Sequence, residues 1–97
     1  MAVREEVQDQ YGNTIYLTDE RWEHILENHP ELDGYRAEVI RTVRSGKRTQ
    51  DAMIPYKFYY SKRFPRLSEE FDAIEAVVLF KWQNDQPNNF IITAYST

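Results

Sequence analysis

The chain has 97 residues, of which 41% are hydrophobic and 14% aromatic, and its formal net charge is −4. This length and apolar content predict one domain over residues 1–97 whose core needs no covalent cross-link. There is no cysteine, which excludes disulfides, thiolate metal sites and cysteine nucleophiles. The charged N-terminal segment and the lack of a membrane-length apolar run predict a cytoplasmic protein with no membrane partner.

A β-hairpin over residues 4–17 and a helix after it are the first predicted elements. Gly12 and Asn13 supply turn geometry between two runs that favour strand. Thr18 can cap the helix with its hydroxyl, and acidic residues follow in the first turn, where exposed N–H groups favour negative charge. Pro30 should end this helix. Its apolar stripe consists of Trp22, Ile25, Leu26 and His29.

Both histidines of the chain belong to this helix, His24 on its acidic face and His29 on its apolar stripe. Their spacing rotates the second about 140° from the first on an ideal helix, which disfavours a metal pair of the i, i+4 kind. No cysteine or third histidine is present to complete such a site, so we expect no metal and no cofactor. Each histidine also has a structural interpretation, His29 as a packed or capping residue and His24 as a solvated one.

The second half of the chain predicts one more helix and four strands. Residues 35–44 have an apolar stripe, and Gly46 can end that helix in the left-handed conformation. Strand patterns follow at residues 49–54, 56–62, 73–82 and 90–95. The sequence therefore predicts an α+β fold, in which the N-terminal hairpin and two helices pack on a four-stranded antiparallel sheet.

Alternation along the strands divides their side chains between two faces. Lys57 and Tyr59 point to one face of their strand and Tyr60 points to the other, and the pattern leaves open which face is buried. Thr93 and Tyr95 are two positions apart on the last strand. They therefore share a face, where both hydroxyls can approach one phosphate.

Charge is distributed unevenly along the chain. Residues 1–35 hold two basic and nine acidic side chains. Residues 36–66 hold nine basic and two acidic side chains, and residues 67–97 hold one basic and five acidic side chains. The middle block predicts a basic strip that meets phosphates. The alternative is internal compensation, in which the strip pairs with the acidic first helix. The basic strip consists of Arg36, Arg41, Arg44, Lys47, Arg48, Lys57, Lys62, Arg63 and Arg66.

The histidines, basic side chains and hydroxyls together suit cleavage of RNA. A metal-independent ribonuclease needs a base for the 2′-hydroxyl proton, an acid for the departing 5′-oxygen and positive charge for the phosphorane. Tyrosine rings can stack on unpaired bases, although the seven tyrosines also suit core packing. We expect RNA contacts from Arg41, Arg44, Lys47, Arg48, Lys62, Arg63 and Tyr60.

Two segments carry a resemblance to a known group of nucleases. Residues 22–30 read W-x-H-I-x-x-x-H-P, and residues 92–95 read I-T-A-Y. With the strand patterns between them, residues 14–95 resemble the phage-associated branch of the barnase, EndoU, colicin and RelE-like (BECR) nuclease-fold group. The resemblance implies helices on a four-stranded antiparallel sheet and RNA cleavage without a metal. It implies catalytic roles for His24, His29, Thr93, Tyr95 and Lys57.

Within this resemblance the two histidines are the acid/base candidates, the two hydroxyls belong to a phosphate site and the lysine is a cationic stabiliser. The first hypothesis is therefore a metal-independent RNA endonuclease of the toxin type or associated with phage or other mobile elements. Its expected partners are RNA and an antitoxin or immunity-type protein. Two alternatives stay open, because a fold alone does not establish an activity: a noncatalytic interaction domain of a toxin–antitoxin or phage-derived system, and an RNA-binding regulator.

Overall fold

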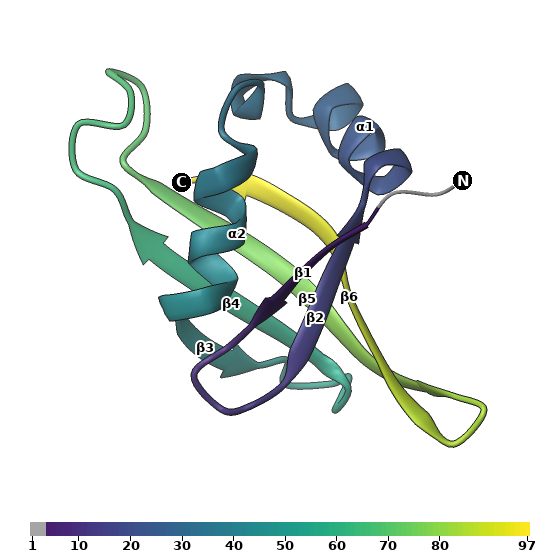
Figure 1. Cartoon of the computed structure of the whole chain (residues 1–97). Helices are drawn as coiled ribbons and strands as arrows, with labels where there is room; N and C mark the ends of the chain where they lie inside the picture. Colours follow the sequence, from purple (N-terminus) through teal and green to yellow (C-terminus); the bar gives the residue numbers. More distant parts are fainter. Residues whose placement is uncertain (1–3) are drawn as a thin grey trace.

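The computed structural model describes residues 4–97 and confirms the α+β class (Figure 1). Within these residues, no helix is long and apolar enough to cross a membrane. In chain order the elements are β1 (Arg4–Gln8), β2 (Thr14–Thr18), α1 (Asp19–Asn28), the 3-10 turn η1 (Pro30–Leu32), α2 (Arg36–Ser45), β3 (Lys47–Gln50), β4 (Lys57–Arg63), β5 (Ala73–Gln83) and β6 (Gln86–Ser96).

The sheet differs from the predicted one: over residues 4–97 it has six strands of mixed direction in place of four antiparallel strands. The strand order is β1-β2-β6-β5-β4-β3, so the N-terminal hairpin is part of the sheet. It joins through a short parallel pairing that sets Ile15 opposite Asn89 and Tyr16 opposite Phe90. This addition lets β2 bury Ile15 and Leu17 completely. A pairing between segments so distant in the chain leaves no local sequence signal, which is why the prediction missed it.

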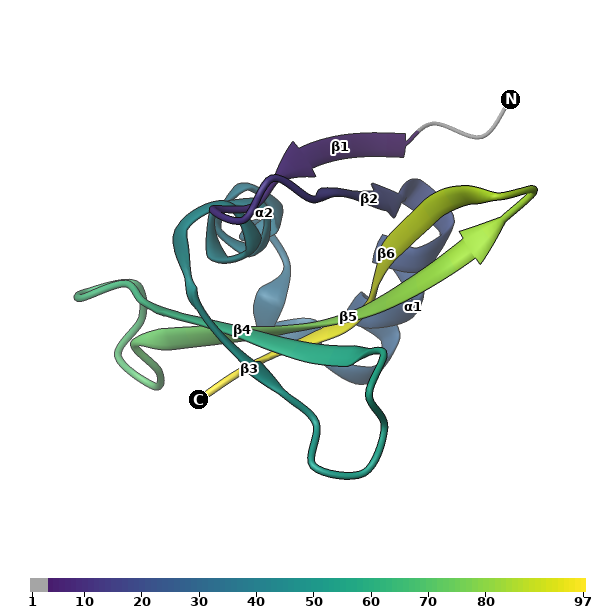
Figure 2. The same cartoon turned by 90° about the horizontal axis from the view of Figure 1, so that it is seen from below.

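The sheet curls around α2. Figure 2 shows α2 between the β1–β2 hairpin and the strands β4 and β5, and α2 contacts β1, β4 and β5. Helix α1 packs on β6 and β2. The core fills the space between these helices and the inner face of the sheet. Its largest fully buried side chains are Ile15, Leu17, Ile25, Leu32, Val39, Val43, Tyr60, Ile74, Val78 and Ile91.

Helix α1 begins and ends where the sequence predicts. The Thr18 hydroxyl accepts a hydrogen bond from the backbone N–H of Arg21 at 3.0 Å, which caps the first turn. The helix ends at Asn28, and the backbone N–H of His29 still donates to Ile25 at 2.7 Å. Pro30 then starts η1, because proline disfavours helical geometry in the residue before it.

Gly46 ends α2, but not in the predicted left-handed conformation. Its φ is −76°, and a Cβ atom at this position would lie 2.3 Å from the Thr42 carbonyl oxygen and 2.8 Å from that of Ser61. Glycine is therefore required for close approach, since the end of α2 touches the backbone of β4 here.

A buried carboxylate links the hairpin turn to the far end of the sheet. Asp9 accepts hydrogen bonds from the backbone N–H groups of Tyr11 and Asn13 at 2.9 Å and from the Tyr60 hydroxyl at 2.5 Å. Arg48 of β3 lies 3.8 Å from the same carboxylate. Burial alone would raise the pKa of Asp9, but the hydrogen bonds from Tyr60 and Asn13 outweigh it and lower the pKa. The carboxylate therefore stays charged inside the fold.

Replacing Tyr60 by phenylalanine should destabilise the protein by about 1.5–3 kcal/mol, because a buried charged acceptor loses a donor. Urea unfolding at neutral pH measures the loss. The Tyr56→Phe variant is the control, since Tyr56 is 44% exposed and should tolerate the change. Equal unfolding free energies for the two variants would show that the Asp9–Tyr60 bond contributes nothing.

The same variant should alter the acid stability of the protein. The pKa of Asp9 in the folded protein lies below its ordinary value of 3.8. Its contribution is therefore present above that value and is lost as the pH falls through the folded-state pKa. Tyr60→Phe removes one cause of the depression and brings the folded-state pKa of Asp9 closer to its unfolded-state value, so the loss of stability on acidification should be smaller than in the wild type. Unfolding free energies measured from about pH 5 downward test this, and coincident pH profiles would refute it.

Candidate functional site

The outer face of β4, β5 and β6 holds a hollow of about 520 Å³ that no helix residue lines. Its floor is apolar, and its rim carries phenol, hydroxyl and ammonium groups. We call it the sheet pocket; its lining consists of Ile54, Tyr56, Lys57, Tyr59, Val77, Leu79, Lys81, Ile92, Thr93 and Tyr95.

Strand register explains why these side chains meet. Tyr59 of β4 and Thr93 of β6 both lie opposite Val77 of β5, so the three form one row across the sheet. Because alternate residues share a face, Lys57 and Tyr95 belong to the same surface. Next to Thr93, the β5–β6 register shifts by one residue, which adds Ile92 to the lining. Three predicted catalytic residues therefore lie together: Lys57, Thr93 and Tyr95.

His29 is placed beside this pocket by the end of α1. Its ring centroid lies 5.9 Å from that of Tyr95, with 40° between the ring planes. Its Nδ1 lies 3.7 Å from the carboxylate of Glu31, and about a third of its side chain is exposed. Glu31 is fixed in turn by a hydrogen bond of 3.0 Å from the Ser96 hydroxyl. The imidazole is thus held between η1 and the last strand.

Two carboxylates near the pocket stay ionised because hydrogen bonds favour their charged forms. Burial would raise the pKa of Glu31, but hydrogen bonds from its own backbone N–H and from Ser96, with the nearby His29, lower it. The Tyr59 hydroxyl donates to Asp51 at 2.6 Å, and this bond, with those from the backbone N–H groups of Met53 and Ile54, lowers the pKa of Asp51 to about 2.

Two of the three phenols that line the pocket, Tyr59 and Tyr95, differ in what their protons can do. The bond to Asp51 raises the pKa of Tyr59 to about 12 and occupies its proton. Burial and the neighbouring Glu75 raise the pKa of Tyr95 above its ordinary value of 10. Tyr95 therefore remains protonated at neutral pH, as a proton donor requires.

His24 does not join this group. It lies on the exposed side of α1, with 54% of its side chain accessible and its Nδ1 3.7 Å from the Glu27 carboxylate. It is not part of the pocket lining. Helix α1 ends at Asn28, so His29 leaves the helical path and lies beside Tyr95, whereas His24 stays on the exposed side of the helix.

The residues predicted to contact RNA are dispersed. Tyr60 is fully buried and bonded to Asp9, so its ring is not accessible for stacking. Arg48 faces the same carboxylate. Arg41 and Lys62 both lie over the ring of Phe64, away from the sheet pocket.

Two other members of the basic strip form ion pairs with carboxylates of the same chain. Arg63 pairs with Asp72 at 2.7 Å, and Arg36 pairs with Asp19 of α1 at 2.9 Å, which is the internal compensation considered above. Arg44 is exposed on α2. Lys47, opposite Ser61, shares the outer face with Lys57.

Sequence reasoning missed the roles of Asp51, Tyr59 and Lys81 at this surface. Lys81 had a signal, because alternation along β5 puts it on the face of Val77 and Leu79. Asp51 also had one, since an aspartate that starts a tight turn commonly accepts backbone N–H groups two or three residues on. The hydrogen bond between Asp51 and Tyr59 depends on strand pairing, so no sequence pattern indicates it.

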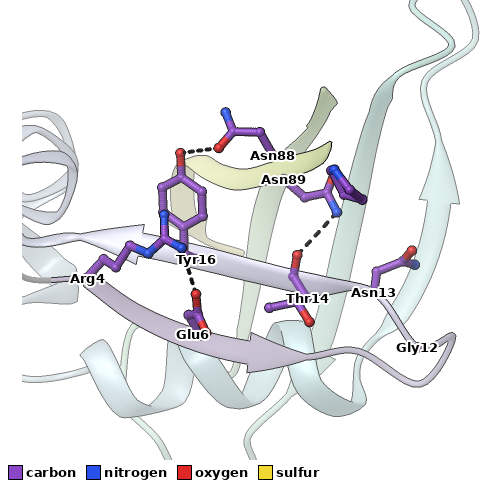
Figure 3. A pocket seen from close by; sticks show the side chains of 9 residues that line it. Arg4, Glu6, Gly12, Asn13, Thr14, Tyr16, Asn88 and Asn89 are labelled. Carbon is purple, nitrogen blue, oxygen red and sulfur yellow. Dashed lines mark hydrogen bonds and ion pairs between the residues drawn. The ribbon is translucent and has the colours of Figure 1, made fainter. Parts of the chain in front are cut away.

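A second hollow, of about 350 Å³, lies between the hairpin and the β5–β6 turn (Figure 3). Its charged groups satisfy one another, because Arg4 donates to Glu6 at 2.8 Å and stacks 4.3 Å from the Tyr16 ring centroid. The Tyr16 hydroxyl donates to Asn88 at 2.9 Å, which joins β2 to β6. None of the predicted catalytic residues lines it. We therefore interpret this hollow as part of the junction between β2 and β6.

Comparison of the chain with protein-family models, curated proteins and solved structures finds no match. Within residues 4–97, no group of three histidine, cysteine or acidic side chains is arranged to hold a metal ion. The interpretation of the sheet pocket therefore depends on its own geometry.

Replacing Tyr59 by phenylalanine should raise the pKa of Asp51 from about 2 toward its ordinary value of 3.8, because it removes the largest cause of the depression. A ¹³C NMR titration of the carboxyl carbon measures this pKa directly. Tyr56→Phe changes a neighbouring phenol outside the bond and should leave the titration unchanged. If Asp51 titrates identically in all three proteins, its link to Tyr59 does not exist in solution.

Proposed function

We propose that the protein is a metal-independent RNA endonuclease whose active site is the sheet pocket and the adjoining His29. One observation carries the proposal: Lys57, Thr93 and Tyr95 line one hollow, and the His29 ring packs against Tyr95. These groups come from the residue after α1, from β4 and from β6, three parts of the chain that the fold brings together. An imidazole, a protonated phenol and an ammonium are the set that cleavage through the 2′-hydroxyl requires.

The proposed reaction assigns one role to each group. His29 takes the proton of the ribose 2′-hydroxyl while the 2′-oxygen attacks the adjacent phosphorus. The bond from phosphorus to the 5′-oxygen breaks, and Tyr95 gives its proton to that leaving oxygen. Lys57 and the Thr93 hydroxyl stabilise the negative charge on the phosphorane oxygens. The products are a 2′,3′-cyclic phosphate and a 5′-hydroxyl, and a second proton transfer restores both groups.

The neighbours of the two proton-transfer groups favour this assignment. The Glu31 carboxylate lies on the Nδ1 side of His29, which favours the tautomer with the proton on Nδ1 and leaves Nε2 as the base. Tyr95 is protonated at neutral pH, and burial and Glu75 raise its pKa further above that range. Tyr59 is a poorer donor, since its proton is already given to Asp51.

We also propose that the protein belongs to the BECR nuclease-fold group that the sequence resembles. His29, Thr93, Tyr95 and Lys57 keep the roles that the resemblance implies, whereas His24 is left out because it lies outside the pocket. The pocket is lined by two ammonium groups, Lys57 and Lys81, which give an RNA phosphate local positive charge in a chain whose net charge is −4. A toxin-type nuclease would also have an antitoxin or immunity-type protein as a partner.

The test is incubation of the purified protein with a labelled single-stranded RNA in EDTA, followed by analysis of the product ends. We expect cleavage to cyclic phosphate ends, and we expect His29→Ala and Tyr95→Phe each to slow it by about 10²- to 10⁴-fold, the usual contribution of a general acid or base. An RNA with a 2′-deoxy sugar at the cleaved position should stay intact, because it lacks the nucleophile.

His24→Ala is the matched control, since it removes an exposed histidine of the same helix outside the pocket. Its cleavage rate should equal that of the wild type. Circular dichroism of each variant checks that folding is retained. Absence of cleavage by the folded wild type would refute the nuclease and favour the noncatalytic interaction domain. Equal loss of activity in His24→Ala and His29→Ala would refute the assignment of the base.

A further inference from the structure

The end of the sheet pocket farthest from His29 is formed by an aromatic ring and an ammonium group. Tyr56 is 44% exposed, and the Nζ atom of Lys81 lies 4.8 Å from its ring centroid. The proposed reaction uses neither residue. By alternation along β5, Lys81 lies four residues, or about 14 Å, beyond Val77, which pairs with Thr93. This end is therefore too far from the catalytic groups to hold the reacting phosphate.

Tyr56 is fixed in place although it lies between β3 and β4. Its carbonyl oxygen accepts the backbone N–H of Phe80 at 2.8 Å, which attaches it to β5. Asp51 accepts the backbone N–H groups of Met53 and Ile54 at 2.8 and 2.9 Å, and this closes the loop before it. A ring carried on an ordered backbone loses less conformational entropy when a ligand stacks on it than one on a mobile loop.

The charge at this end favours an anion. Lys57 lies over the Tyr59 ring, with its Nζ 5.7 Å from the centroid, and Lys81 lies over Tyr56. Over residues 4–97, neither ammonium is within 4.0 Å of a carboxylate oxygen. The carboxylate of Asp51 is nearby and stays ionised, but the two ammonium groups outnumber it at this end of the pocket. The negative charge of Glu75 lies at the opposite end, beside Tyr95.

We propose that this end is a subsite for an unpaired nucleotide that flanks the cleaved bond. Its base stacks on Tyr56 over the apolar floor, and the phosphate on its far side lies at Lys81, whereas Lys57 stays at the reacting phosphate. A base in a duplex has both faces covered, so the subsite selects single-stranded RNA. The role of this subsite in cleavage rests on the proposed nuclease function. Binding of RNA to the subsite can be measured without cleavage.

The experiment measures binding of a fluorescent RNA of about six nucleotides in which every sugar is 2′-O-methylated and therefore cannot be cleaved. Fluorescence anisotropy gives the dissociation constants of the wild type and the variants. Tyr56→Ala should weaken binding at least fivefold, and Tyr56→Phe should retain it, because stacking needs the ring and not the hydroxyl. Lys81→Gln should weaken binding and reduce the slope of log K against log salt by about 0.7, the value for one phosphate contact on a single strand.

Trp82→Ala is the matched control, because Trp82 is the next residue of β5, is 73% exposed and alternates to the other face. Its affinity should equal that of the wild type. Unchanged binding by Tyr56→Ala, an equal loss in Trp82→Ala, equally tight binding of the duplex form, or no binding of the single strand would each overturn the subsite. Binding that depends on Tyr56, together with no cleavage of unmodified RNA, would refute the nuclease and leave the subsite in a single-strand-binding domain.

Discussion

The hydrogen bond between Asp9 and Tyr60 is the constraint on which the shape of this protein depends. It joins the turn after β1, at one edge of the sheet, to β4, near the other edge. The twisted sheet curls around α2 (Figure 2), and the Asp9–Tyr60 hydrogen bond joins its two sides. The inner face is then filled by helices, while the outer face of β4, β5 and β6 is left without a helix and becomes the sheet pocket.

Two adjacent tyrosines show how one strand serves both faces. Tyr60 points inward and bonds to the buried Asp9, and Tyr59 points outward and bonds to Asp51. The first pair is shielded from water, so its loss leaves a buried charge without a donor and affects the whole fold. The second pair is at the surface, where it orders the loop that carries Tyr56. The fold and the pocket therefore depend on the same alternation along β4.

The sequence predicted the local features of this structure and missed those that depend on distant pairing. The Thr18 cap, the stop before Pro30 and the hairpin turn follow from neighbouring residues, and each is present. Alternation placed Thr93 and Tyr95 on one face but could not tell which face of the sheet the helices cover. Tyr60 was therefore assigned to RNA contacts although it lies in the core. The requirement for glycine at Gly46 was also invisible, because it arises from the backbone of β4.

The position of His29 shows why a helical pattern alone could not define the site. On a continuous helix, His29 would follow the apolar stripe into the core, and a role in catalysis would conflict with that burial. The proline after it ends the helix, so His29 takes φ and ψ of −135° and 68° and its ring turns toward Tyr95. Pro30 also starts the turn that presents Glu31 to the Nδ1 side of the imidazole. A single helix-ending signal thus gives the proposed base its place and its exposure.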